Sequence, residues 1–479
     1  MKQFFIKITL VLYLIFGLSS AYAQDENFNY LVTLGSGLSS ETTLPFWLES
    51  NRFGSVPNTD YLLLNASIYA DLKKENKDFG IAYKLNATGF IGNENATTGY
   101  VADGNSVLIN ELYLRLQYKN WAMDFGNIYD EIKWEGLSSA NGNIVKSNNA
   151  RAMPGINIKT LDYIKLPFAK KWLRIQLNFA NYWLNDNRVV ADAMLHHKSL
   201  YFKFITGHKF SIEAGIDHYA QWGGTHPTLG DQPSSFKDFL RVVTGSSGGS
   251  NSLETDQLNV LGNQLGSYLL QFNYTGETTD WNFYYSHLFE DGSGMEMQNW
   301  MDGLYGLMVD LKKPQATISH LLAEFTYTAN MSGENPPDVP ELPARGWDNY
   351  FNNSVYESGW TYFGSTIGSP YFTTVPVDED GITKGVIRGD NRFMAFNIGA
   401  KGSFHHINYK AMLSHTTYFG WFDQEYEVKP TQFSGLLEFN IPQFHNIPFD
   451  ISLSGSFDTG TYRPVNFGGF ITLTRSGLF

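Results

Sequence analysis

The chain has 479 residues, no cysteine, and 47 acidic against 34 basic residues, which gives a formal net charge of −13 at pH 7. This charge argues against nucleic acid as a partner, because phosphate binding needs a basic surface. Without cysteine, neither disulfides nor thiolate metal sites can hold the fold. Aromatic residues make up 16% of the chain. Together with abundant glycine, that content favours a transmembrane β-barrel over a soluble secreted β-protein.

The N-terminus has the pattern of a cleaved secretory signal at residues 1–23. Lys2 and Lys7 form its positive region, a short apolar run follows, and Ala21-Tyr22-Ala23 fits a cleavage site. The apolar run is shorter than the roughly 20 residues of a membrane-spanning helix. We therefore predict a mature chain of residues 24–479, with 32 basic and 47 acidic residues and a net charge of −15, in the outer membrane.

Alternation of apolar and polar residues runs through most of the mature chain. In 62–72 every second residue is apolar, and 81–91 and 171–183 repeat the pattern. Period two is the signature of a strand. We predict eighteen strands, at residues 28–37, 61–72, 79–91, 106–118, 121–130, 156–166, 171–183, 198–206, 209–220, 264–276, 280–290, 303–311, 316–330, 391–403, 406–419, 430–442, 448–460 and 466–479.

The connections between these strands alternate between short and long. The longer ones include 92–105, 131–155, 221–263 and 331–390. Short turns on one side and long loops on the other are typical of outer-membrane barrels. We therefore predict one all-β domain, a transmembrane antiparallel β-barrel of about eighteen strands. Its lumen is wide enough for a channel, and we expect the two longest loops to plug part of it.

The 221–263 loop contains a predicted helix. Ser235 and Asp238 have capping-box spacing. An apolar face follows at i, i+3, i+4 and i+7, formed by Phe236, Phe239, Leu240 and Val243. We expect this face to be buried against the inner rim of the barrel. Trp222, next to two glycines, is a candidate sugar-stacking platform. The alternative is that Trp222 belongs to an aromatic girdle or packs beneath the loop.

The 331–390 loop combines four prolines with aromatic, Asp and Asn residues, in Trp347-Asp348-Asn349-Tyr350 and Trp360-Thr361-Tyr362-Phe363. Rings stack on the CH faces of sugars while amides and carboxylates bind their hydroxyls, so this composition suits carbohydrate. The alternative is a self-packed lid over the pore. Near the N-terminus, part of 39–60 is a candidate short helix, and the side of the membrane on which it lies stays open.

A third loop contains carboxylates among glycines and tryptophan, at Asp291, Trp300 and Asp302. The ligand spacing of an EF-hand is missing, so a solvated or structural role is the alternative to ligand binding. The pairs His196-His197 and His405-His406 point to opposite faces of their strands and do not suit a metal. We predict no catalytic residue, cofactor or metal.

The predicted glycan contacts are aromatic and ionisable loop residues: Trp222, Asp238, Arg241, Asp291, Trp300, Asp302, Trp347, Asp348, Tyr350, Trp360, Tyr362 and Arg392. Because the chain is acidic, an acidic glycan would need local basic residues or bridging divalent cations. The local basic residues considered are Arg241, Arg345, Arg388 and Arg392.

Nine stretches resemble the Wzi-type capsule-assembly proteins of the outer membrane in their Bacteroidetes form: PFWLESNRFG (45–54), QWGGTHP (221–227), DFLRVVTG (238–245), LNVLGNQLGSY (258–268), LFEDGSGM (288–295), MDGLYGL (301–307), LLAEFTYT (321–328), WDNYFNNSVYESGWTYFG (347–364) and GDNRFMAFNIGAKG (389–402). The resemblance implies an eighteen-stranded, non-enzymatic lectin that holds capsular or other exopolysaccharide, with outer-membrane lipid and the capsule export machinery as further partners. Members of the family also carry a small helical bundle near the N-terminus on the periplasmic side, but this sequence departs from them there, because only a short stretch around 42–52 could be helical. The alternatives are a diffusion channel and, less favoured, a hydrolase such as an outer-membrane phospholipase.

Overall fold

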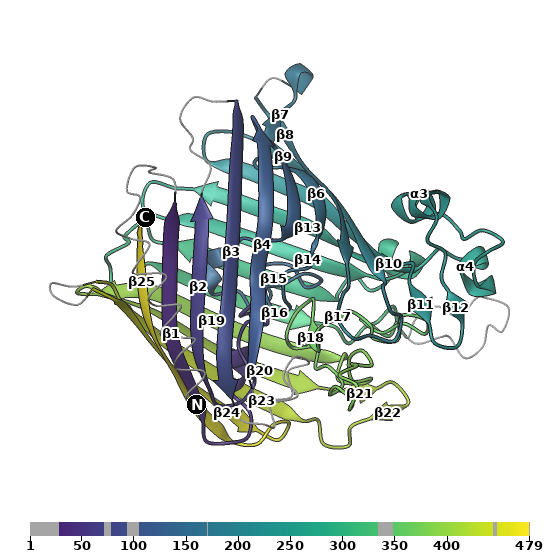
Figure 1. Ribbon diagram of the computed structural model, residues 1–479. Coiled ribbons are helices and arrows are strands. Elements are labelled where there is room, and N and C mark those ends of the chain that lie inside the picture. Colours follow the sequence, from purple (N-terminus) through teal and green to yellow (C-terminus); the bar gives the residue numbers. More distant parts are fainter. Residues whose placement is uncertain are drawn as a thin grey trace.

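The computed structural model describes residues 28–70, 78–92, 105–169, 171–333, 348–443 and 448–478. The signal peptide predicted at 1–23 lies outside these ranges. Nineteen strands form one antiparallel sheet, in which β1 pairs with both β2 and β25 and so closes a barrel (Figure 1). Because β6 and β7 both pair with β8, they are two pieces of one crossing, and the barrel has eighteen strands.

The barrel strands are β1 (Asn29–Ser39), β2 (Tyr61–Ala70), β3 (Phe79–Gly92), β4 (Asn105–Tyr118), β5 (Trp121–Asn127), β6 (Gly155–Thr160), β7 (Ile164–Lys165), β8 (Leu173–Trp183), β9 (Met194–Ile205), β10 (Phe210–Trp222), β13 (Asn263–Thr275), β14 (Asp280–Phe289), β15 (Gly303–Asp310), β16 (His320–Tyr327), β19 (Phe393–Phe404), β20 (Ile407–Tyr418), β23 (Thr431–Ile441), β24 (Asp450–Gly460) and β25 (Asn466–Leu478). The eighteen predicted strands are confirmed with boundary shifts of a few residues. The main difference is the break between β6 and β7.

The loops carry short elements. The helices are α2 (Phe46–Glu49), α3 (Phe236–Thr244), α4 (Glu254–Leu258) and α5 (Gly292–Met295), with 3-10 turns at Trp134–Gly136 and Pro167–Ala169. The hairpins are β11 (Thr225–His226) with β12 (Gly230–Asp231), β17 (Thr361–Tyr362) with β18 (Ser365–Thr366), and β21 (Gly420–Trp421) with β22 (Gln424–Glu425). No helix in the described ranges is long and apolar enough to cross a membrane.

The alternation along each strand separates the two faces of the wall. On β4, Leu112 and Leu114 are 51% and 42% exposed on the outer surface, whereas Glu111 is only 4% exposed on the inner surface. The outward apolar residues form the band that contacts lipid, and the inward polar residues line the lumen.

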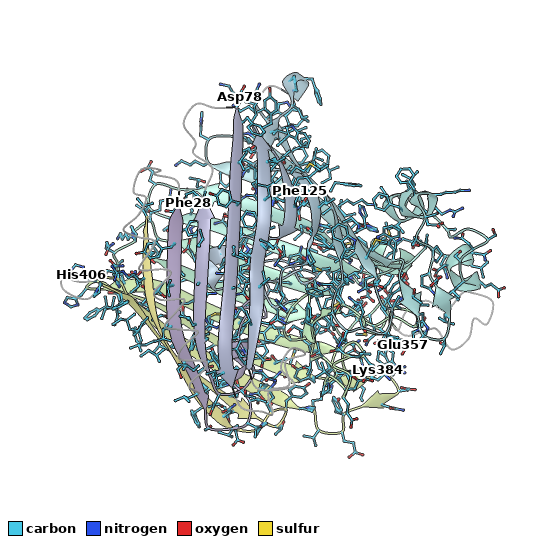
Figure 2. The ribbon with its side chains drawn as sticks, in the orientation of Figure 1. Phe28, Asp78, Phe125, Glu357, Lys384 and His406 are labelled. Atoms are coloured by element: carbon cyan, nitrogen blue, oxygen red, sulfur yellow. The ribbon has the colours of Figure 1, made fainter. Side chains whose placement is uncertain are left out.

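The two ends of the barrel differ as the loop lengths predict. Figure 2 shows Asp78 and His406, which lie in short turns, at the end of the barrel opposite Glu357 and Lys384 of the long loops. We call these the short-turn end and the long-loop end. The 40–60 link joins the long-loop ends of β1 and β2. The periplasmic helical bundle implied by the resemblance is not found in the part of the chain that the structure describes.

The 223–262 loop does not fill the lumen, and this part of the prediction is wrong. The loop projects from the wall, where Figure 1 shows α3 and α4 beside the barrel. The capping box of Ser235 and Asp238 is present as predicted. However, the predicted apolar face is only partly covered: Phe239 packs on the outward Phe179, with ring centroids 6.3 Å apart, but Phe236 stays 75% exposed. Helix α3 therefore lies against the outside of the barrel.

The lumen is filled mainly by the 128–154 link, for which the sequence predicted no role. Leu137, Ile144 and Val145 in this link are fully buried and belong to the main hydrophobic core. Residues of 348–372 and α2 join the same core. We call these three parts the plug. They close the long-loop half of the lumen, as the prediction of a partly plugged barrel requires.

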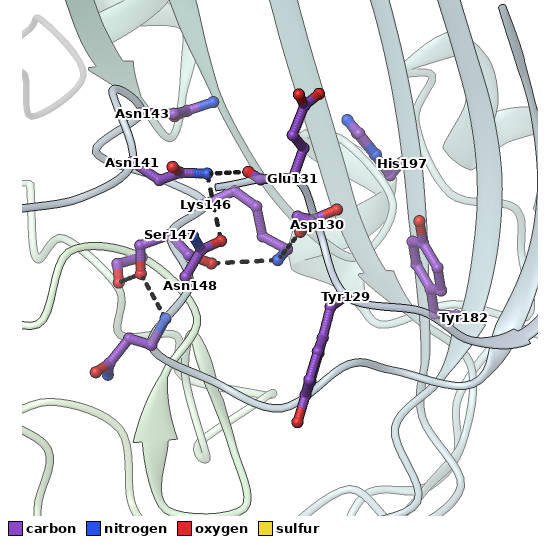
Figure 3. A network of polar contacts seen from close by, with 12 residues as sticks. Tyr129, Asp130, Glu131, Asn141, Asn143, Lys146, Ser147, Asn148, Tyr182 and His197 are labelled. Atoms are coloured by element: carbon purple, nitrogen blue, oxygen red, sulfur yellow. Dashed lines mark hydrogen bonds and ion pairs between the residues drawn. The ribbon is translucent and has the colours of Figure 1, made fainter. Parts of the chain in front are cut away.

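Polar contacts stabilise the 128–154 link within the barrel (Figure 3). Lys146 Nζ lies 2.5 Å from Asp130 Oδ2, and Asn141 Nδ2 donates to the backbone carbonyl of Glu131 at 2.9 Å. The side chain of Asp130 is 54% exposed although it points toward the wall residues His197 and Tyr182 (Figure 3). The space between the 128–154 link and this part of the barrel wall is therefore open to water.

One wall carboxylate anchors the plug. Glu324 on β16 accepts bonds from the Ser138 hydroxyl (2.5 Å) and the Ser139 amide (2.7 Å) of the link. It also accepts bonds from the wall residues Tyr284 (2.5 Å) and Asn397 (3.1 Å). A buried donor that loses its partner costs about 1–3 kcal/mol.

We therefore expect Glu324→Ala to loosen the plug and to raise the single-channel conductance in planar bilayers above the closed level of the parent barrel. The thermal unfolding temperature should also fall. The matched control is Glu213→Ala, since the bonds of Glu213 within the described structure go to the wall residues Lys203, Tyr163 and Asn273. Equal conductance in the two variants would contradict the anchoring role.

Candidate functional site

A pocket of about 260 Å³ lies among the long loops. Four separate parts of the chain build it: the 43–58 segment, residues 149–151, the 363–377 segment, and Arg463 in the link between β24 and β25. We call it the loop pocket. Its side chains include two guanidinium groups, phenylalanine rings, amides and one carboxyl: Arg151, Arg463, Phe46, Phe363, Phe372, Asn58, Asn149 and Glu49.

Helix α2 positions one wall of the loop pocket. Pro45 is the N-cap and ends the extended segment. The amide of Phe46 donates to Asp458 Oδ2 on β24 at 2.9 Å, which places a carboxylate at the N-terminus of the helix. Trp47 is 2% exposed and donates from Nε1 to Ser414 Oγ at 3.0 Å. With these two residues fixed in the barrel, Glu49 and Ser50 line the loop pocket.

Two arginines lie against aromatic rings of the loop pocket. The guanidinium carbon of Arg463 is 5.3 Å from the Phe46 ring centroid, and that of Arg151 is 4.8 Å from the Phe363 centroid. Gly54 makes room for Arg151, because a Cβ at Gly54 would lie 2.8 Å from Arg151 Cγ, and its φ of +53° also favours glycine. The arrangement presents planar cations beside apolar ring surfaces.

The remaining carboxyl of the loop pocket is weakly acidic. Burial raises the pKa of Glu49, and the positive charge of Arg463 offsets this only in part. Glu49 is therefore neutral over a wider pH range than an ordinary glutamate. With two guanidinium groups and a carboxyl that resists ionisation, the loop pocket favours an anionic ligand.

Two of the predicted aromatic contacts support the loop pocket from beneath. Trp360 is fully buried and donates from Nε1 to the Val145 carbonyl at 2.6 Å. Tyr362 is 2% exposed and its hydroxyl bonds Asn185. The next residue, Phe363, lines the pocket and donates its amide to Asp186 Oδ2 at 3.0 Å.

Three predicted contacts lie on the outside of the wall. Trp222 is 5% exposed, its ring centroid is 5.3 Å from that of Phe239, and its Nε1 donates to Asn181 at 3.1 Å. No ring face of Trp222 is open to a sugar, so its environment matches the alternative of packing beneath the loop. Asp238 caps α3 and pairs with Arg241 at 2.7 Å.

A second group of predicted contacts does come together, as a network within the loops. The hydroxyl of Tyr350 donates to Asp302 at 2.6 Å, and Asp302 also accepts the amides of residues 330 and 331. Burial raises the pKa of Asp302 and of Asp348 to about 6 in each case. Because Asp302 and Tyr350 are fully buried, this network packs the loop and does not present these two residues to a ligand.

The remaining predicted contacts are scattered. Trp300 is 62% exposed, and Asp291 is exposed and caps α5. Arg392 is buried, with its guanidinium carbon 3.8 Å from the Phe422 ring. Trp347 lies outside the described residues. Within the described ranges, no three His, Asp or Glu side chains gather as a metal site.

Sequence reasoning missed the main residues of the loop pocket. Arg151, Arg463 and Glu49 were not among the predicted contacts, and Arg388, which was considered, lies over the Trp421 ring at 4.1 Å. The only sequence signal was the stretch 45–54, which resembled a known family and contains Phe46 and Glu49. Nothing in the local pattern connected that stretch with residues 100 and 400 positions away.

Comparison with solved structures places the fold among outer-membrane barrels. The chain is similar to Wzi of Escherichia coli, which is described as an outer membrane protein involved in group 1 capsule assembly and a carbohydrate-binding β-barrel. The TM-score is 0.58 and the sequence identity is 12%, over 94% of this chain and 84% of that chain. It is also similar to OccAB4 of Acinetobacter baumannii (TM-score 0.49, 9% identity, 95% and 99% covered) and OccK8 of Pseudomonas aeruginosa (0.46, 6%, 94% and 98%).

Such low identities show the fold alone. No curated protein sequence matches the chain. The family model described as capsule assembly protein Wzi matches residues 39–377, which is more than half of the chain and includes most of the loop pocket. The chain therefore belongs to the capsule assembly protein Wzi family, as an outer-membrane β-barrel.

Proposed function

We propose that this barrel binds an acidic capsular or other exopolysaccharide at the cell surface through the loop pocket, and so helps to assemble the capsule without acting as an enzyme. The observation that carries the proposal is the pairing of Arg151 with Phe363 and of Arg463 with Phe46 in one pocket. The carbohydrate binding described for the E. coli relative supports the same function here.

The chemistry of the loop pocket suits a sugar acid. A guanidinium binds a carboxylate through two parallel hydrogen bonds, and the neighbouring rings offer surfaces for the CH face of a pyranose. The volume of about 260 Å³ is slightly below the usual range of ligand pockets, about 300–1,000 Å³. The pocket therefore fits one or two sugar units of a longer chain, while the rest of the polymer lies across the exposed loops.

The alternative of a diffusion channel requires the plug to move. Leu137 and Ile144 are fully buried inside the barrel, and Glu324 anchors the same link. The similarity to the Occ proteins has TM-scores below 0.5 and does not favour the channel. The chain resembles the Bacteroidetes form of the family in nine stretches, and we propose that it belongs to this form.

Two further partners complete the proposal. Outer-membrane lipid contacts the apolar band of the barrel. This band extends to the exposed Phe236 and Leu240 of α3 on the outer wall. Exposed loop residues such as Trp300 and Asp291 are candidates for contacts with the polymer or with the capsule export machinery.

We expect Arg151→Ala and Arg463→Ala each to weaken binding of the purified barrel to the cell's own acidic capsule by about tenfold, since each removes a charge-assisted contact. Binding can be measured by surface plasmon resonance on immobilised capsule. Arg241→Ala is the matched control, because Arg241 lies on α3 outside the wall. If the control loses as much binding as the two pocket variants, the loop pocket is not the site.

Binding should also weaken as pH rises. The raised pKa of Glu49 keeps the carboxyl neutral to a higher pH than in an ordinary glutamate, and once it ionises it repels the sugar carboxylate. Glu49→Gln should keep its binding as pH rises, because its side chain stays neutral. The exposed Glu41 in the same link provides the control Glu41→Gln, which should keep the parental pH dependence. A parental pH profile in Glu49→Gln would contradict this role.

A further inference from the structure

A second and larger cavity lies inside the barrel, on the other side of one short segment of the chain. Its volume is about 480 Å³, and we call it the lumenal cavity. Ser50 and Val56 line both this cavity and the loop pocket. The segment 50–56 is thus a thin partition between them. Asn51 Nδ2 donates to the Ser139 carbonyl at 2.8 Å and the Phe53 amide to the Asn148 carbonyl at 2.7 Å, which fixes the partition to the plug.

The barrel wall of the lumenal cavity carries a ladder of amides. Asn65, Asn86 and Asn110 lie on neighbouring strands β2, β3 and β4 and bond one another: Asn65 Nδ2 to Asn86 Oδ1 at 3.0 Å, and Asn110 Nδ2 to the same oxygen at 2.7 Å. Asn110 Nδ2 also donates to the Thr88 hydroxyl at 2.6 Å. All four residues line the cavity.

One amide of this ladder is incomplete. Asn110 is only 4% exposed, and its side-chain carbonyl oxygen has no hydrogen-bond partner among the described residues. Asn51 Oδ1 and Arg52 Nε, on the partition across the cavity, are likewise buried and unpaired within the described part of the chain. Buried polar groups in proteins are normally satisfied. Asn110, Asn51 and Arg52 thus bring two spare acceptors and one spare donor to residues that line the lumenal cavity.

The lumenal cavity is also lined by aromatic rings and by charged groups that pair with each other. Phe53 and Tyr129 stack with ring centroids 4.0 Å apart, and both line the cavity. Glu438 lies between two cations, 3.1 Å from Arg52 and 3.3 Å from Lys410. Because these charges are paired within the protein, they leave the cavity without a net preference for an anion.

We propose that the lumenal cavity is a second glycan site, which takes a neutral mono- or disaccharide unit from the inner side of the plug. Amide oxygens and nitrogens bind sugar hydroxyls, and the ring surfaces of Phe53 and Tyr129 suit its CH faces. The volume lies within the usual range of ligand pockets, about 300–1,000 Å³. The two sites differ in charge preference, one for acidic and one for neutral sugar units. This inference rests on the proposed function, because it assumes that the barrel meets glycan.

The test is isothermal titration of the full mature barrel in detergent with fragments of two to four sugars, prepared by partial hydrolysis of the cell's own capsule. Two variants block the lumenal cavity. Asn110→Leu removes the unpaired carbonyl, and Met412→Trp fills the space from the buried, cavity-lining Met412. The matched variant for the loop pocket is Arg463→Ala. Heat-dependent migration on gels checks that each barrel is folded, and Met412→Trp decides if Asn110→Leu does not fold.

We expect two binding events per parent barrel. The cavity variants should weaken one of them by about tenfold and leave the other unchanged, while Arg463→Ala should affect only the other. A single event that is lost in Arg463→Ala and kept in the cavity variants overturns the lumenal site and leaves the proposed function intact. A single event lost only in the cavity variants supports the lumenal site and overturns the loop pocket. No binding in the parent barrel overturns both.

Discussion

Closure of the sheet between β1 and β25 is the constraint on which the rest of the structure depends. Inside a membrane every backbone amide and carbonyl must be paired within the protein, and a barrel achieves this only without a free edge. Eighteen strands close that edge but also enclose a lumen wide enough to conduct. The 128–154 link fills it with Leu137, Ile144 and Val145, held to the wall by Glu324. The plug therefore closes a lumen that this strand number would otherwise leave open.

The same closure determines where a binding site can form. Antiparallel strands bring every second connection to one end, so loops that are far apart in the chain meet over the plug. The loop pocket uses this arrangement, because Arg151 and Arg463 come from opposite parts of the sequence and face one pocket. The buried Trp360 and Tyr362 hold the pocket without lining it. Such a site is rigid, since its support is the hydrophobic core that also closes the barrel.

The fold was predictable from the sequence to a far greater degree than the site. Strand positions depend on local alternation, and a residue such as Leu112 shows its outward orientation through its immediate neighbours. The position of a loop side chain depends on contacts that are distant in sequence. Trp222 illustrates the difference: the strand that leads into it was predictable, but its cover by Phe239 on the outer wall was not. The capping box at Ser235 was also predictable, because it is a local motif, whereas the side of the wall on which α3 lies is not.

The central claim is that a plugged barrel binds polysaccharide at the loop pocket. Hydrogen–deuterium exchange of the barrel in outer-membrane vesicles, with and without the cell's own capsular polysaccharide, tests it most directly. We predict slower exchange in peptides that cover 43–58, 149–151 and 363–377, and no change in α3 on the outer wall. Protection confined to α3 and the 223–262 loop, or no protection in any of these peptides, would contradict the account.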